Sequence, residues 1–184
     1  MIIHPQVPTE TEGVHRQPFT LPRGSEVLVR EATTEDADGL RAMFARCSAE
    51  TIYLRFHLAY AAVPEPLIER LVGATGRGGR AFVAVSGEGI VGHAMYARER
   101  DDAGEAEMAV VVEDARQGSG LGGLLLSVAS AEARRAGVET LTCLTLWENR
   151  RVLDLARRVF GGIRVRYAGG TLSVRVPLRS TATG

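Results

Sequence analysis

Four glycines fall within six residues, from Gly118 to Gly123, in the stretch RQGSGLGG. An apolar run precedes this stretch over 107–112, and a longer apolar run follows it over 121–135. The first run predicts a strand and the second a helix, so the glycines occupy a strand-to-helix connection. Backbone without side chains lets a ligand approach closely, and the free N–H groups of a helix N-terminus attract anions. The stretch therefore predicts an anion-binding loop in an α/β chain, with a tight steric turn as the alternative.

Two glycine patterns overlap in this loop. A dinucleotide fingerprint, G-x-G-x-x-G, would begin at Gly118, whereas a second pattern, Q-x-x-G-x-G, begins at Gln117. The dinucleotide fold needs a strand that runs almost directly into the first glycine and an acidic residue at the end of the next strand. Here five residues separate Val112 from Gly118, and Glu139 precedes the next predicted strand. The sequence therefore favours the pattern that begins at Gln117, and it lacks the G-K-[ST] of a P-loop.

Hydrophobic periodicity predicts seven strands and four helices in the order βααβββαβαββ. Strands are expected at about 26–30, 81–85, 90–96, 107–112, 141–146, 163–167 and 172–176, and helices at about 34–44, 64–72, 121–135 and 149–159. Residues 48–57 are expected to be less regular, and Gly137 should end the long helix as a left-handed cap. The fold class is α/β (α+β), with one mixed, mostly antiparallel sheet. A flexible arm over 1–24, one domain over 25–178 and a tail over 179–184 are expected.

Composition and charge limit the partners. The 184 residues carry 22 basic and 22 acidic side chains, so no net charge draws the chain to nucleic acid or to an anionic membrane. No apolar run is long enough for a membrane span, and the N-terminus lacks a secretory pattern. Cys47 and Cys143 are expected to be reduced thiols in a cytoplasmic protein. His57 and His93 have no metal-ligand spacing, so no metal is expected. His93 is expected to be a packing or surface residue of its strand, with a place in the acceptor groove as the alternative.

The strand, the polar connection and the glycine loop resemble the central motif of the GNAT superfamily of acyl-CoA-dependent N-acyltransferases. Here the motif runs VVVEDARQGSGLG over 110–122, and the element order over about 26–177 resembles the family order. The resemblance implies the GNAT fold, with acetyl-CoA as co-substrate, its pyrophosphate on the loop and its pantetheine arm beside the strand. The implied acetyl-CoA-binding residues are Val110, Val112, Gln117, Gly118, Ser119, Gly120, Leu121, Gly122, Gly123 and Asn149.

Three further stretches resemble the bacterial protein lysine acetyltransferase, or Pat-like, branch: TIYLRF at 51–56, AEMAVV at 106–111 and WEN at 147–149. In that branch the glutamate of the second stretch is the general base, which implies this role for Glu107. A lysine amine has a pKa near roughly 10.4, so a carboxylate that removes its proton would assist acylation. A solvated charge beside an acidic turn is the alternative for Glu107. The resemblance also makes Tyr53, Arg55 and Phe56 candidates for the acceptor wall.

The expected activity is acetyl transfer to a primary amine by direct attack in a ternary complex, with protein lysines as the first acceptor. A backbone N–H near Val111 or Val112 is expected to stabilise the developing oxyanion. Many family members place a tyrosine seven residues after the asparagine, and Ala156 stands there instead, so no general acid is assigned. A small-molecule amine acceptor and a non-catalytic acyl-CoA sensor are the alternatives, and the oligomeric state is not predicted.

Overall fold

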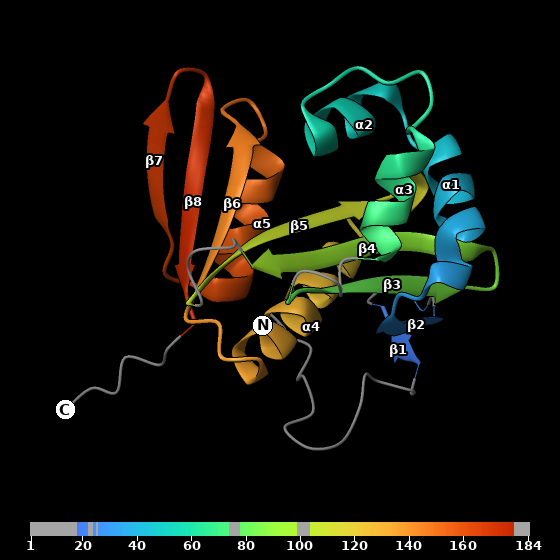
Figure 1. The fold of residues 1–184 in the computed structure, drawn as a ribbon, viewed down its shortest axis with the longest axis horizontal. Helices are drawn as coiled ribbons and strands as arrows, with labels where there is room; N and C mark the ends of the chain where they lie inside the picture. The colour runs from blue at the N-terminus through green and yellow to red at the C-terminus, as the bar shows by residue number, and fades with distance from the viewer. Residues whose placement is uncertain (1–17, 22–23, 25, 74–77, 99–103, 179–184) are drawn as a thin grey trace.

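The computed structural model describes residues 18–21, 24, 26–73, 78–98 and 104–178. In this part of the chain eight strands form one sheet, accompanied by five α-helices (Figure 1). The strands are β1 (Phe19–Thr20), β2 (Glu26–Glu31), β3 (Arg80–Ser86), β4 (Gly89–Arg98), β5 (Glu105–Val112), β6 (Thr140–Leu146), β7 (Arg164–Ala168) and β8 (Thr171–Pro177). The helices are α1 (Ala37–Ala45), α2 (Ala49–Phe56), α3 (Glu65–Val72), α4 (Leu121–Arg135) and α5 (Arg150–Phe160), with 3-10 turns η1 (Thr34–Asp36) and η3 (Asp114–Arg116).

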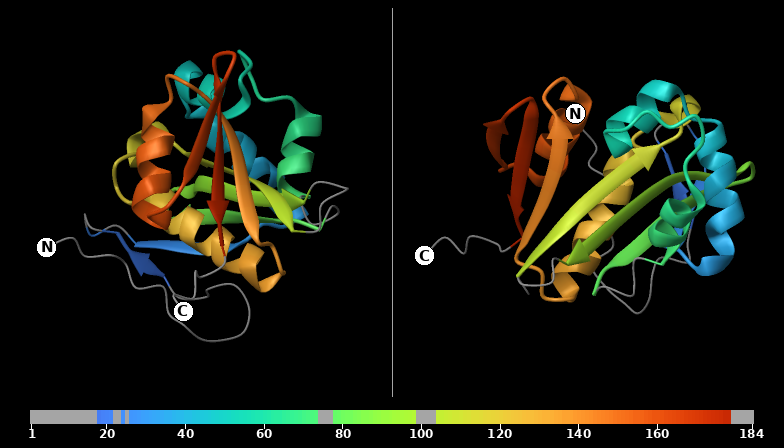
Figure 2. Two further views of the ribbon diagram at one scale, coloured as in Figure 1. Left: turned by 90° about the vertical axis from the view of Figure 1, so that its left-hand side faces the viewer. Right: turned by 45° about the horizontal axis from the view of Figure 1, so that its top comes forward.

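The sheet has the strand order β1-β2-β3-β4-β5-β6-β8-β7. All neighbouring strands are antiparallel except β5 and β6, which run parallel. The parallel pairing is short and ends where Glu107 meets Thr142. From Met108 to Val112, β5 pairs with β4 alone, so β5 and β6 separate toward the glycine loop (Figure 2). One edge of β5 is therefore open in the middle of the sheet.

Helices cover both faces of the sheet (Figures 1 and 2). On one face, Leu121 and Leu125 of α4 pack into a core with Phe82 and Tyr96. On the other face, α1, α2 and α3 contribute a second core, listed here by its fully buried members: Leu40, Met43, Ile68, Ala81 and Val83. Alternation of side chains along each strand supplies both cores at once, because successive residues point to opposite faces. The glycine loop and the open edge of β5 lie between these two layers.

The predicted α/β class and the mixed, mostly antiparallel sheet are confirmed, with two further elements. Residues 48–57, expected to be irregular, contain α2: Ser48 caps the helix by accepting a hydrogen bond from the N–H of Thr51. The β-branched pair Thr51-Ile52 weakened the helical signal, but Ile52 is buried against the second core, and this burial stabilises the helix. Phe19–Thr20 pairs with β2, so the sheet begins before residue 25. Residues 1–17 of the expected arm and the expected tail lie outside the described residues.

Two smaller expectations are also confirmed. Gly137 follows the end of α4 with φ of +82°, and the N–H of Val138 donates to the carbonyl of Ala133 at 2.9 Å. This arrangement is the left-handed cap that the sequence predicts. Cys47 and Cys143 are free thiols. In the part of the chain that the structure describes, no helix combines the length and the apolar character needed to cross a bilayer.

Candidate functional site

The connection between β5 and the glycine loop is tied down by a buried carboxylate. Glu113 is almost fully buried and accepts a hydrogen bond from Nε of Arg46 at 2.7 Å. Nη2 of Arg46 also donates to the carbonyl of Ile90 at 2.6 Å, and Nε of Arg116 lies 3.8 Å from the second carboxylate oxygen. A buried carboxylate needs such partners, because an unpaired charge in the interior is costly. The loop therefore starts from a fixed position between α1 and β4.

Asp114 clamps the same connection to the beginning of α2. Its carboxylate accepts hydrogen bonds from the N–H of Ser48 at 2.8 Å, the hydroxyl of Ser48 at 2.7 Å and the hydroxyl of Thr51 at 3.0 Å. Burial acts to raise the pKa of Asp114, but these hydrogen bonds outweigh it and hold the pKa below its ordinary value. The sequence reasoning missed this clamp, because its partners lie more than 60 residues away and form no motif.

Gln117, the first residue of the motif, connects three elements through its side-chain amide. Nε2 donates to the hydroxyl of Thr51 at 3.1 Å and to the carbonyl of Val112 at 3.2 Å. Oε1 accepts from Nη1 of Arg151, on α5, at 3.1 Å. The side chain thus joins α2, β5 and α5. Gln117 was predicted to bind acetyl-CoA; its amide is used within the protein and fixes the position of the loop.

The loop from Gln117 to Gly123, called here the anion cradle, has backbone that few side chains tolerate. Gly118 and Gly120 have φ of +72° and +91°, values in the left-handed region that favours glycine. Gly120 is the N-cap of α4, whose first turn contains no acidic residue. The N–H groups of Leu121, Gly122 and Gly123 therefore have no partner within the helix. Together with the helix dipole, they form a binding site for a negatively charged group.

The other members of the cradle contribute only backbone. The side chain of Leu121 is fully buried, and the hydroxyl of Ser119 donates to the carbonyl of Arg116 at 2.6 Å. A Cβ added to Gly122 would lie 3.2 Å from Cδ2 of Leu155 on α5. The steric alternative therefore applies to the back of the cradle, where α4 and α5 pack closely, while the anion-binding prediction fits its front.

A cavity of about 240 Å³ lies where β5 and β6 separate, and we call it the β5–β6 cavity. Glu107, on its wall, is exposed and occupies the last position at which β5 pairs with β6. Val110 lines the same cavity, as does Asn149, whose Oδ1 also accepts from the N–H of Val152 at 3.3 Å and caps α5. The structure thus brings Glu107, Val110 and Asn149 together. Val112 is not in the wall, and its carbonyl bonds Gln117.

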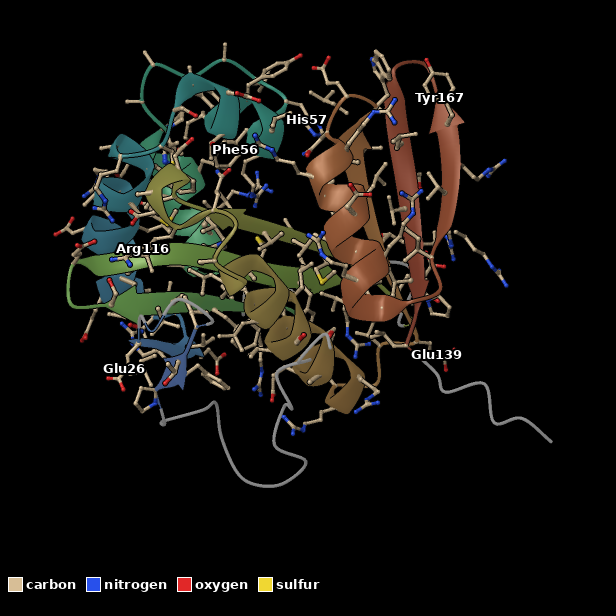
Figure 3. All side chains as sticks on the ribbon, turned by 180° about the vertical axis from the view of Figure 1, so that it is seen from behind. Glu26, Phe56, His57, Arg116, Glu139 and Tyr167 are labelled. Atoms are coloured by element: carbon tan, nitrogen blue, oxygen red, sulfur yellow. The ribbon has the colours of Figure 1, made fainter. Side chains whose placement is uncertain are left out.

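The end of α2 closes the cavity from the opposite side. Arg55, Phe56 and His57 line it, and Figure 3 shows Phe56 and His57 at the end of α2 that faces β6 and α5. Tyr53, also expected in this wall, is absent from the lining and exposed. Nε of Arg55 is buried and has no hydrogen-bond partner in the described part of the chain. Burial lowers the pKa of Arg55, and the neighbouring Glu107 carboxylate opposes that shift.

Two other titratable groups near Arg55 are neutral at physiological pH. Cys143 lines the cavity, and burial raises the pKa of its thiol to about 11. His93 is fully buried on β4, with Nε2 3.2 Å from the carbonyl of Leu71. Burial, reinforced by the charge of Arg55, lowers the pKa of His93 to about 3. His93 is thus a packed residue, as the sequence predicts, and not a member of the cavity wall.

Comparison with known proteins relates this geometry to a family. The acetyltransferase (GNAT) family model matches residues 41–161, more than half of the chain. The fold is similar to the GNAT domain of S. lividans PAT, with 24% identity, a TM-score of 0.81, and coverage of 88% of this chain and 96% of that one. It is also similar to yncA, a putative acetyltransferase from Salmonella typhimurium solved with acetyl-CoA (20% identity, TM-score 0.67, coverage 85% and 96%). A phosphinothricin acetyltransferase from Sinorhizobium meliloti in complex with AcCoA matches at 19% identity and TM-score 0.69, with coverage of 86% and 92%. The chain belongs to the GNAT family of acetyltransferases.

Proposed function

We propose that this protein is an acetyl-CoA-dependent N-acetyltransferase that acetylates a primary amine, with protein lysine side chains as the first candidate acceptor. One observation carries the proposal: the anion cradle and the Glu107 carboxylate lie at opposite ends of β5, and the open edge of that strand runs between them. Support also comes from relatives of the same fold that were solved with acetyl-CoA. Acetyl-CoA is an extended molecule with a pyrophosphate far from its thioester, so it suits this separation.

The anion cradle and the open edge of β5 would each bind a different part of acetyl-CoA. The front of the anion cradle would hold the pyrophosphate, and the open edge of β5 would offer backbone groups to the pantetheine arm. Acetyl-CoA supplies the acyl group as an activated thioester. A backbone N–H near Val111 or Val112 would stabilise negative charge on the carbonyl oxygen, as an oxyanion hole does.

Glu107 would accept the proton of the acceptor amine, directly or through one water. An ammonium cannot attack a carbonyl, so removal of this proton is required before or during transfer. The position of Glu107 supports this role, because its exposed carboxylate lies on the wall of the β5–β6 cavity. Ala156 also lines that cavity and offers only a methyl group. This position therefore supplies no general acid for the departing thiolate, which can take its proton from solvent.

Replacement of Glu107 by Gln tests the proposal. We expect kcat/KM for amine acetylation to fall by roughly 10²–10⁴-fold, the usual contribution of a general base. The Kd for acetyl-CoA should not change, because the anion cradle is untouched. Glu69→Gln, on the exposed surface of α3, is the matched control and should leave both constants unchanged. Wild-type kcat/KM in the Glu107→Gln variant would exclude the carboxylate as base.

A small-molecule amine is the second candidate acceptor. Arg55 lines the same cavity as Glu107, and its Nε has no hydrogen-bond partner among the described residues, so it could bind an anionic group of a small acceptor. The release of free CoA thiol, measured with lysine-containing proteins and with small amines, separates the two candidates. Tight acetyl-CoA binding without turnover on any amine would instead favour a non-catalytic acyl-CoA sensor.

A further inference from the structure

Arg55 projects from α2 into an unusual environment. Its guanidinium carbon lies 4.9 Å from the ring centroid of Phe56, and Nη2 lies 3.8 Å from Sδ of Met95. These contacts are a cation–π contact and a weak contact to sulfur, neither of which neutralises a positive charge. Nε is buried, and no described residue is its hydrogen-bond partner. Arg55 is therefore held in place by apolar and polarisable groups.

Two other arginines of this protein pair with buried carboxylates. Arg30 donates to Asp36 at 2.7 and 2.5 Å, and Arg46 donates to Glu113 at 2.7 Å. Arg55 makes no ion pair with any carboxylate in the part of the chain that the structure describes. A desolvated guanidinium without such a partner is costly, because arginine does not lose its proton in proteins. The structure thus places on the wall of the β5–β6 cavity a guanidinium that feels the charge of Glu107 but makes no ion pair with it.

The other charged groups of the cavity wall influence which ligands Arg55 can bind. Among the described residues that line the cavity, the titratable ones are Arg55, His57, Glu107 and Cys143. The Cys143 thiol keeps its proton at neutral pH, since its pKa is raised to about 11 by burial. Glu107 is thus the anionic group of the wall, and it is exposed to solvent. The wall presents one carboxylate and one guanidinium, separated by more than ion-pair distance.

This pair discriminates between kinds of amine. A simple ammonium is attracted by Glu107 and repelled by Arg55. An amine that also carries a carboxylate is attracted by both groups, with its amino end toward Glu107 and its anionic end toward Arg55. The planar fork of arginine donates two parallel hydrogen bonds to a carboxylate, and such charge-assisted pairs are strong and selective.

We propose that Arg55 is the specificity residue of the acceptor site and binds a carboxylate that the acceptor carries near its reactive amine. This inference rests on the proposed acetyl transfer to amines and narrows the acceptor to amino-acid-like chemistry. The carboxylate could belong to a free amino acid or to an acidic residue beside a lysine in a peptide. The experiment below distinguishes these two sources.

Matched acceptors test the inference on the wild-type protein. The panel contains free α-amino acids, β-alanine and 4-aminobutyrate, each with its carboxamide, and lysine peptides with glutamate or glutamine beside the lysine. We expect kcat/KM for the carboxylate form to exceed that for the amide form by roughly 10- to 100-fold, as a charge-assisted hydrogen-bonded pair allows. The preferred member of the panel identifies the source of the carboxylate. Equal rates for carboxylate and amide forms would overturn the inference.

Variants of Arg55 provide the second arm. Arg55→Gln should remove the preference by raising KM for the carboxylate-bearing acceptor, and Arg55→Lys should restore part of it. The KM for acetyl-CoA should be unchanged in both, which also shows that the variants are folded. Arg70→Gln, on the exposed surface of α3, is the matched control. A preference that survives in Arg55→Gln would overturn the inference.

Calorimetric titration of the amino acids into the CoA-bound protein separates this inference from the proposed function. Binding that requires Arg55 but gives no turnover with any amine would support the anion site and contradict acetyl transfer. Turnover of simple amines and neutral peptides alone would support acetyl transfer and contradict the anion site. Neither binding nor turnover with any amine would overturn both.

Discussion

The connection from β5 to the glycine loop and the surroundings of Arg55 differ in how completely their polar groups are paired. In the connection to the glycine loop, Glu113, Asp114 and Gln117 each have two or more hydrogen-bond or ion-pair partners within the protein. Around the C-terminal end of α2, two buried polar atoms, Nε of Arg55 and Nδ1 of His93 on β4, have none among the described residues. Buried polar groups are normally hydrogen-bonded, so such exceptions are informative.

This difference indicates that the proposed sites for acetyl-CoA and for the acceptor are organised differently. The connection that leads into the anion cradle is held in position without a ligand, because Glu113, Asp114 and Gln117 are hydrogen-bonded within the protein. The C-terminal end of α2 is held by packing, and its Arg55 makes no ion pair with a carboxylate among the described residues. A preformed site suits a co-substrate that is the same in every turnover, whereas a cation without an ion-pair partner suits selection of an acceptor. Four changes, ordered by the size of the expected effect, test this contrast.

Gly120→Asp, in the glycine loop, should have the largest effect. Aspartate at φ of +91° is strained, and its carboxylate would repel a pyrophosphate at the helix N-terminus. We expect the Kd for CoA to rise by at least about 1000-fold, or about 4 kcal/mol, while circular dichroism remains native-like. Gly170→Asp is the control, since Gly170 has φ of +87° and open space around it in the β7–β8 turn. Normal CoA binding in Gly120→Asp would reduce the cradle to a structural turn.

His93, on β4, should give the unfolding free energy a characteristic pH dependence. The unfolded chain binds a proton at His93 near pH 6.5, whereas the folded protein binds it only near pH 3. The stability that neutral His93 contributes is therefore complete above pH 6.5 and is lost as the pH falls toward 3. Between pH 7 and pH 5 we expect this residue to account for a loss of about 2 kcal/mol in unfolding free energy.

Urea denaturation of His93→Gln at several pH values measures this contribution. The variant is expected to lose the part of the pH slope that begins near pH 6.5, whatever its stability at pH 7. The wild-type protein, measured at the same pH values, is the reference. An unchanged slope in His93→Gln would mean that His93 is protonated in the folded protein.

Asp114→Asn should lower the unfolding free energy by about 1–2 kcal/mol at pH 7, because three hydrogen bonds lose their charged acceptor. The folded-state pKa of Asp114 is lowered, so its contribution is present above the unfolded pKa near 4 and is lost at lower pH. The difference between variant and wild type should therefore shrink in acid. Asp154→Asn, which loses only an exposed ion pair with Arg157, is the comparison and should cost little.

Gly123→Ala should have the smallest effect, and in the opposite direction. An added Cβ would lie 3.7 Å from Cγ2 of Val159, an ordinary contact, and alanine favours a helix over glycine. We expect unfolding free energy to rise by roughly 0.5–1 kcal/mol in thermal or urea unfolding. Gly122→Ala should gain less, since its Cβ would lie only 3.2 Å from Leu155. Equal gains would show that α4 and α5 pack less closely than described.

Local sequence signals predicted most of the fold. Strand periodicity, the glycine loop and the Gly137 cap were sufficient for the sheet, the long helix and its end. The helix at 49–56 was missed, because Thr51 and Ile52 have weak helical preference and their stabilisation comes from burial against distant residues. For the site, Glu107, Val110 and Asn149 were predicted from a family resemblance and do line one cavity.

The sequence by itself determined where backbone is free of side chains and which residues alternate between two faces. Those properties are local, because they depend on neighbours within a few positions in the chain. Only the tertiary structure decided that Asp114 clamps α2, that the side chain of Gln117 serves the protein, and that Arg55 enters the cavity without a carboxylate. Each of these depends on contacts between residues 34 to 66 positions apart, which local preference does not encode.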